Sequence, residues 1–310
     1  MAVLQRRIEK LQVFTYLHAM TNWTEPLKSI WRALPFTGDP APLVTVIELN
    51  GVIGEIGAGR KGLTLKKLEK SILAAFKPGS LKAVALAINS PGGSPVQSRL
   101  LLSAVRRQAK EKNVPVLAFI EDVGASGGYI LALAGDEIYA DESSIVGSIG
   151  VISGGFGFSE AIAKIGVERR VYTAGENKST LDPFRPEDPE DVARLNDMLD
   201  DLHQQFIALV KDRRGGKLAD DDKLFSGRIW TGVQAVDKGL IDGTAQLGEF
   251  LRDRFGKDVK VKRIAPEGGS LLKMLLSGGE AKNVGALSLL DAEEVLAAGE
   301  RRALWARVGL

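Results

Sequence analysis

The amino-acid sequence predicts an α/β protein whose mainly parallel sheet is covered by helices. Apolar runs of strand length alternate with stretches of helical periodicity, which is the pattern of parallel strands joined by crossover helices. The expected strands cover 43–53, 82–89, 114–121, 137–140, 145–152 and 167–173. The expected helices cover 64–76, 96–112, a segment carrying Tyr129 to Leu133, and 187–214, with one more in 225–243 and a helix and strand in 246–263.

The first three strands are marked by apolar runs that end in turn residues. LVTVIELNGVI at 43–53, KAVALAIN at 82–89 and VPVLAFIE at 114–121 have the length and composition of buried strands. The glycine-containing loops EIGAGRKG and SPGGSP follow the first two runs, and a cluster of glycines follows the third. These loops lie where parallel strands end.

The region 187–214 is predicted to form one long amphipathic helix. Its apolar residues recur at alternating intervals of three and four, which marks one face of a helix. They are Val192, Leu195, Leu199, Leu202, Phe206 and Leu209. This stripe is explained by packing within the chain or by contact with another copy of it.

Three parts are expected along the chain. Residues 1–42 read as a helical lead-in and linker, 43–263 as the main domain, and 264–310 as an appendage. The appendage is expected to end in a helix at 291–307, because Asp291 and Glu294 have the spacing of a capping box.

Composition excludes several classes of site and partner. The 310 residues carry a formal charge of +2, which gives no reason to expect nucleic acid as a partner. The chain has no cysteine and two histidines, so we expect no disulfide and no metal site. It shows no secretory signal and no run of about 18 apolar residues. We therefore expect a cytoplasmic protein, with peripheral membrane contact through tryptophans in the lead-in as one alternative to packing on a protein surface.

A serine in a glycine-rich turn is the first candidate for chemistry. Ser126 in GASGGYI follows a predicted strand and precedes a helix, so it suits a nucleophile or, equally, an N-cap. His18 and His203 lie outside this region and do not suit a catalytic base. A lysine can replace histidine where burial disfavours its charged form. Lys178 in GENKSTLDPF is a candidate, although an isolated loop lysine is normally a solvated surface charge.

Two further segments bring backbone and hydroxyl groups that suit the same chemistry. INSPGGS at 88–94 can direct the Gly93 N–H at an oxyanion, with the Gly127 N–H as second donor, or it can be an ordinary turn. Ser148 in VGSIGV can hydrogen-bond a neutral lysine amine, or it can be a buried serine bonded to the backbone.

Together these segments resemble the signal peptide peptidase A family in its compact form. The matching pieces are INSPGGS, EDVGASGGYILALAGDEIYAD, SSIVGSIGVI, the lysine of GENKSTLDPF and GRIWTGVQAVDKGLIDG, within 43–243. The family consists of bacterial serine proteases with a serine–lysine dyad on a crotonase-like fold, related to the caseinolytic protease. The resemblance implies Ser126 as nucleophile, Lys178 as general base, Gly93 as an oxyanion donor, and Ser148 as the residue that orients the lysine.

The resemblance also implies a function and an assembly. We expect a serine endopeptidase that degrades signal-peptide remnants or other peptides and proteins, assembled as a homo-oligomer and using no metal or organic cofactor. The first 42 residues carry no membrane anchor of the kind usual in the family, which leaves the substrate open. Alternatives are a capsid-maturation protease of the same family, a crotonase-fold acyl-CoA hydratase or isomerase, and a non-catalytic assembly protein.

Overall fold

The computed structural model describes residues 41–55 and 62–264, together with six residues near the C-terminus. These six are Gly299, Arg302, Ala303, Trp305, Ala306 and Val308. The chain divides into two units, Met1–Pro42 and Leu43–Leu310, and the fold below is that of the second. Nearly all of the expected lead-in and most of the expected appendage lie outside the described residues, so the predicted boundaries stay predictions.

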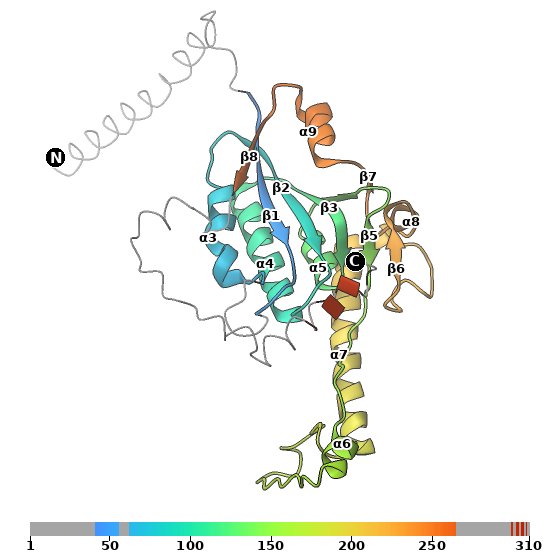
Figure 1. The fold of residues 1–310 in the computed structure, drawn as a ribbon. Coiled ribbons are helices and arrows are strands. Elements are labelled where there is room, and N and C mark those ends of the chain that lie inside the picture. Colours follow the sequence, from blue (N-terminus) through green and yellow to red (C-terminus); the bar gives the residue numbers. More distant parts are fainter. Residues whose placement is uncertain are drawn as a thin grey trace, which may run out of the picture. The chain divides into compact units, whose positions relative to one another are not determined.

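A mainly parallel sheet forms the centre of the second unit (Figure 1). Its strands are β1 (Leu43–Asn50), β2 (Leu81–Ser90), β3 (Val116–Ala125), β4 (Glu137–Ala140), β5 (Ile145–Gly147), β6 (Ile229–Thr231), β7 (Gly243–Thr244) and β8 (Lys260–Ile264). The main path has the order β6-β5-β3-β2-β1-β8, and β4 pairs with both β3 and β7. Among the described strands only β5 and β6 pair antiparallel. The predicted α/β class with a mainly parallel sheet is confirmed.

Helices cover both faces of this sheet. They are α3 (Leu65–Ala75), α4 (Pro95–Lys112), α5 (Gly127–Ala132), α6 (Ser159–Lys164), α7 (Pro189–Arg214), α8 (Gly232–Asp237) and α9 (Leu247–Phe255), with a 3₁₀ turn at Gly215–Lys217. On one face Leu49, Leu86 and Ile120 belong to the cluster that packs under α3, α4 and α5. On the other face Val46 and Phe119 pack against Leu251 of α9. The alternation of side chains along each strand therefore fills two apolar layers.

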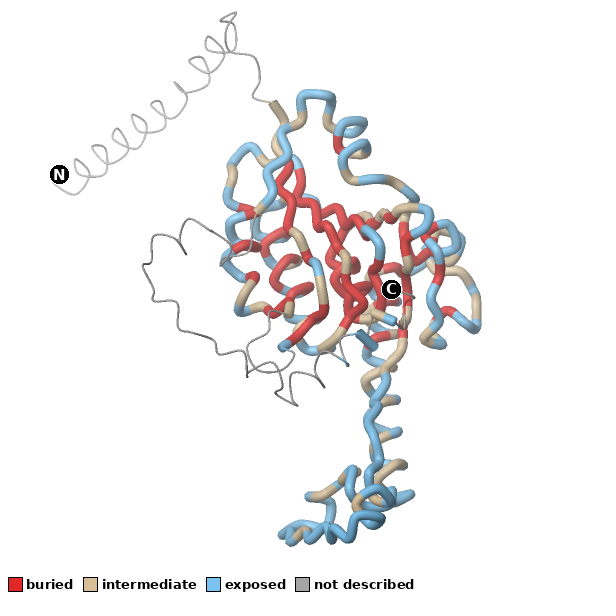
Figure 2. Tube along the Cα trace, in the orientation of Figure 1, coloured by how far each residue is buried: buried red, intermediate tan, exposed pale blue. Residues whose placement is uncertain are grey.

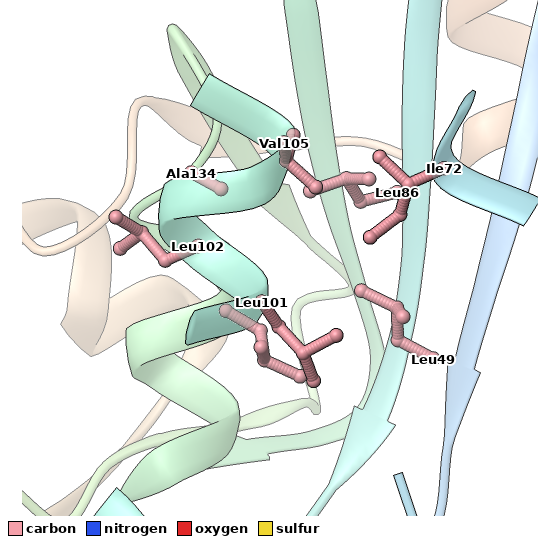
Figure 3. A pocket seen from close by; sticks show the side chains of 8 residues that line it. Leu49, Ile72, Leu86, Leu101, Leu102, Val105 and Ala134 are labelled. Atoms are coloured by element: carbon pink, nitrogen blue, oxygen red, sulfur yellow. The ribbon is translucent and has the colours of Figure 1, made fainter. Parts of the chain in front are cut away.

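The core under α3 and α4 contains a small apolar cavity. Leu49 and Leu86 of the sheet and Leu101 of α4 are among the side chains that line it (Figure 3). Its volume is about 10 Å³, room for one water-sized sphere, and its lining carries no polar group. It is a packing defect of the core and lies apart from the polar residues considered below.

Residues 151–205 form an arm that projects from the body (Figures 1 and 2). No residue in this range is buried, whereas the buried residues of α7, namely Phe206, Val210 and Arg214, all lie in its C-terminal half. The predicted helix at 187–214 is thus confirmed as α7, but only part of its apolar stripe packs within the chain. The segment between α6 and α7 lies at the far end of the arm (Figure 1).

The predicted strand at 167–173 is wrong. The segment has no regular secondary structure and its side chains are mostly exposed. Val167, Val171 and Tyr172 are residue types that favour strands, but a strand needs a partner for its backbone, and no described segment pairs with this part of the arm. Two predicted strands also end early. β1 ends before Gly51 and β5 ends before Ser148, and both of these residues have positive φ.

The base of α7 is fixed to the body by two arginines. Arg213 donates to the carbonyl oxygens of Leu133 and Gly135 at 2.8 and 2.9 Å, just beyond the end of α5. Arg214 is buried and forms a bidentate ion pair with Asp242, in which Nη1 donates to Oδ2 at 2.9 Å and Nη2 donates to Oδ1 at 3.2 Å. Burial alone would raise the pKa of Asp242, but hydrogen bonds from Arg214 and Lys217 hold it below its usual value. The direction of α7 is therefore set by buried polar contacts.

Arg214→Ala should destabilise the protein by about 3 kcal/mol, because it removes the buried partner that bonds both oxygens of the largely buried Asp242 carboxylate. Lys217 bonds the same carboxylate at 2.6 Å but is half exposed, so Lys217→Ala should cost only about 0.5 kcal/mol. Urea unfolding of the two variants measures the difference. Equal losses would show that Arg214 does not anchor the helix.

Candidate functional site

Ser126 lies in a strained turn between β3 and α5. Its φ is +53° and its ψ is −121°, a conformation that residues other than glycine rarely adopt. Its N–H donates to the carbonyl oxygen of Gly147 at 2.8 Å, which fixes the turn to the end of β5. Ser126 occupies the N-cap position of α5, yet its side chain makes no capping hydrogen bond. The hydroxyl is therefore left for another partner.

Glycines are required around this turn because backbone segments touch. A Cβ placed on Gly92 would lie 2.8 Å from both the Gly127 nitrogen and the Ser126 Cβ. A Cβ on Gly128 would lie 2.3 Å from the Ser90 oxygen, and one on Gly127 would lie 2.5 Å from the Ser98 hydroxyl. The turn after β2 and the turn after β3 thus pack directly on each other.

Two backbone N–H groups at this contact have no acceptor in the described part of the chain. They belong to Gly93 and Gly127. The loop that carries Gly93 is held by Ile53, whose N–H donates to Gly92 and whose carbonyl accepts from Ser94, both at 2.8 Å. The loop is therefore held by hydrogen bonds to Ile53. Its unbonded Gly93 N–H lies beside Ser126, the candidate nucleophile. Such a pair of donors suits an oxyanion.

Ser148 directly follows the strand beside β3 and lies at the same level as Ser126. β3 and β5 are parallel, and their register pairs Ala125 with Gly147. Ser126 and Ser148 are therefore the first residues after the ends of two adjacent strands. Adjacent strands are about 4.8 Å apart. Ser148 also has a φ of +53°, and its N–H donates to the Arg228 carbonyl oxygen at 2.8 Å. Its hydroxyl has no hydrogen-bond partner among the described side chains and backbone groups.

Lys178 is not brought to Ser126 within one chain. It is exposed in the loop between α6 and α7, where its N–H donates to Gly175 at 3.2 Å. The same loop contacts the first turn of α7, since the Leu181 N–H donates to the Asp191 carboxylate at 3.2 Å. The lysine therefore belongs to the far end of the arm.

The length of α7 indicates how far that end lies from the serines. The His203 ring lies 3.1 Å from the Ile149 carbonyl oxygen, one residue beyond Ser148. Pro189, where α7 begins, is 14 residues earlier, which corresponds to about 21 Å of helix. His203 meets the backbone rather than Ser126, and His18 lies outside the described residues.

The sequence patterns identified Ser126, Gly93, Gly127 and Ser148, but they did not identify the residues that hold these four in place. Ile53, Gly92 and the Arg228 carbonyl hold the loops that carry Gly93 and Ser148. The first glycine of PGG and the GRIWTG segment are the sequence features that could have indicated these residues, but neither shows which backbone atoms will meet.

Two further features, a cluster of metal ligands and a membrane-spanning helix, are absent from the residues that the structure describes. No group of three or more histidine, aspartate or glutamate side chains is arranged to hold a metal ion there. In the same residues no helix is both long and apolar enough to cross a membrane.

Comparison with known proteins places this chain in a family of peptidases. The family model described as Peptidase family S49 matches residues 108–261. A putative protease of Synechocystis is 32% identical over 213 residues, which cover 69% of this chain and 72% of that protein. One variant of a membrane-bound stomatin-specific protease, solved with a substrate peptide, has 16% identity and a TM-score of 0.45, over 77% of this chain and 97% of that chain.

The chain also matches longer proteins with a different name. The Na⁺/H⁺ antiporter NhaA of Brucella abortus is 48% identical over 272 residues, 86% of this chain. The chain spans only 37% of the length of that relative, so the antiporter name is not carried over. The peptidase match and the Synechocystis relative show that the chain belongs to peptidase family S49, the signal peptide peptidase A family.

Proposed function

We propose that the protein is a serine endopeptidase with Ser126 as its nucleophile. The observation that carries this proposal is the strained turn of Ser126, whose unbonded hydroxyl lies beside the unused N–H groups of Gly93 and Gly127. Strain is retained where surrounding structure enforces it and function requires it. Membership of the S49 family supports peptide-bond hydrolysis as the reaction.

The general base is Lys178 of a second copy of the chain. The lysine of the same chain lies at the end of the arm, and the arm cannot fold back without breaking α7, which is continuous over 26 residues. Large apolar side chains of the arm are also exposed to solvent: Phe156 is 75% exposed, Ile165 74% and Tyr172 90%. Exposed apolar surface of this kind favours contact with another protein surface. A neighbouring copy would cover it and receive the lysine.

In the proposed reaction the neutral Lys178 amine takes the proton of the Ser126 hydroxyl as its oxygen attacks the peptide carbonyl carbon. The Gly93 and Gly127 N–H groups donate to the resulting oxyanion. The lysine ammonium then gives its proton to the leaving amine as the C–N bond breaks and an acyl-enzyme remains. A water molecule, deprotonated by the same amine, releases the acyl group. Ser148 accepts a hydrogen bond from the lysine and orients it.

The substrate is a peptide or an unfolded protein segment. An extended chain exposes its carbonyl groups to attack and can hydrogen-bond through its backbone. Signal-peptide remnants, capsid proteins and location in the cytoplasm with peripheral membrane contact stay predictions. Family membership gives no support to the acyl-CoA alternative.

Mixing two inactive variants tests whether the dyad forms between copies. Ser126→Ala and Lys178→Ala should each lower kcat/KM for a fluorogenic peptide at least 1000-fold, since each removes a dyad member. Co-refolding them in equal amounts should restore activity, with about one site in four intact by random mixing. If the mixture stays inactive while it assembles normally, the lysine does not act between copies.

Gly92→Ala should lower kcat at least about 100-fold in the fraction of the protein that remains folded, which circular dichroism measures. The added methyl group would press on both the Gly127 nitrogen and the Ser126 Cβ, so the oxyanion donors and the nucleophile would lose their alignment. Loss of one oxyanion donor costs about 100-fold to 1000-fold in kcat. Gly79→Ala is the control, because no atom lies within 4 Å of its Cβ. Comparable rates for both variants would contradict the proposed oxyanion site.

Activity should rise with pH over the range from 6 to 9, because only the unprotonated amine can accept the serine proton. The measurement is kcat/KM against pH on a peptide without titratable side chains. A profile that falls from neutral to alkaline pH, with the protein still folded, would rule out a lysine base.

A further inference from the structure

An apolar patch lies on the sheet directly before the two serines. It consists of Val123 and Ala125 of β3 and Ile145 of β5, and the register pairs Val123 with Ile145. A Cβ on Gly124 would meet Ile120, which packs under the helices, so Val123 and Ala125 point to the opposite face. This is the face that α9 covers further along the strands. α9 does not belong to the cluster at the patch.

Two residues from the C-terminal segment cover this patch. Val308 is 3% exposed and belongs to one cluster with Val123 and Ala125, and Trp305 packs against that cluster. The Val308 N–H donates to the Trp305 carbonyl oxygen at 3.0 Å, so the two side chains lie one turn apart on one side of the segment. The described pieces of this segment are drawn in dark red in Figure 1.

The contact has the features of a docked segment rather than of a core. The cluster holds only three buried residues and is separate from the two larger clusters of the body. Gly299, Arg302, Ala303 and Ala306 of the segment are all exposed. Among the described residues of this segment, Trp305 and Val308 are the side chains that pack on the cluster. Because this described contact is small, we expect the segment to be able to leave the patch.

We propose that Val123, Ala125 and Ile145 form a binding site for the apolar side chains of a helical peptide segment, which the chain's own Trp305 and Val308 fill, and that this occupant restricts access to Ser126. The ligand class is a short helix with an aromatic and a β-branched side chain three positions apart. The restriction rests on the proposed function, whereas the binding site does not.

The position of the patch gives the physical reason for the restriction. Ser126 directly follows Ala125, and Ser148 lies three residues beyond Ile145. A substrate carbonyl and the lysine of a second copy both have to reach this edge of the sheet. Trp305 and Val308 stand beside the two strands that carry the serines, so a docked segment competes for space with both.

Binding is tested without catalysis in full-length chains that carry Ser126→Ala. The probe is a fluorescein-labelled peptide of residues 299–310. The peptide should bind the chain that also carries Val308→Asp at least tenfold more tightly than the chain that carries Ser126→Ala alone. The reason is that a charge at position 308 cannot be buried in the apolar patch, so the chain's own C-terminal segment leaves it. A peptide with Asp in place of Val308 should not bind. Equal binding of the two peptides, or no binding, would overturn the site.

Access is tested by the rate at which a fluorophosphonate labels Ser126. Val308→Asp and Trp305→Ala should each raise this rate several-fold at an unchanged Tm, and the free peptide should reverse the increase. Ala306→Asp is the control, since it places the same charge on an exposed position of the segment. An unchanged rate, or a lower rate with a lower Tm, would overturn the restriction. No labelling in any variant would instead refute Ser126 as nucleophile, while the peptide titration would still decide the site.

Discussion

The contact between the Gly92 backbone and the Ser126–Gly127 peptide is the constraint on which the site depends. Two turns that follow different strands meet with no space for a side chain, and each is held from its other side. Ile53 bonds the Gly92 turn, and the Gly147 carbonyl accepts from Ser126. These bonds enforce the positive φ of Ser126 and leave two amides unpaired. The parallel sheet supplies the register that brings the two turns together.

The separation of Ser126 from Lys178 follows from the stiffness of α7. The arginines at its base fix its direction, and the exposed residues of its N-terminal half give no reason for it to bend toward the body. Under the proposed mechanism a lone chain is inactive and assembly completes the site. Assembly would also shield the Lys178 amine from water. The C-terminal segment would add a second control at the same edge of the sheet.

Local patterns in the sequence predicted most of the fold and most of the candidate site. Ser126, Gly93, Gly127 and Ser148 were identified because each lies in or beside a glycine-containing turn near the end of a predicted strand, and because these segments together resemble one family. The strand at 167–173 was wrong since alternation cannot show whether a backbone partner exists. The sequence gives no sign that Lys178 lies far from Ser126, because distance depends on where a long helix points. The Trp305 contact joins residues about 180 positions apart and has no local signal.

The central claim is that a lysine from one copy of the chain completes the site of another. A cryo-electron-microscopy structure of the assembled protein tests it most directly. The Lys178 Nζ should lie about 3 Å from the Ser126 Oγ of a neighbouring copy, within hydrogen-bond distance. An assembly in which every Lys178 amine faces solvent, away from all Ser126 hydroxyls, would contradict the claim.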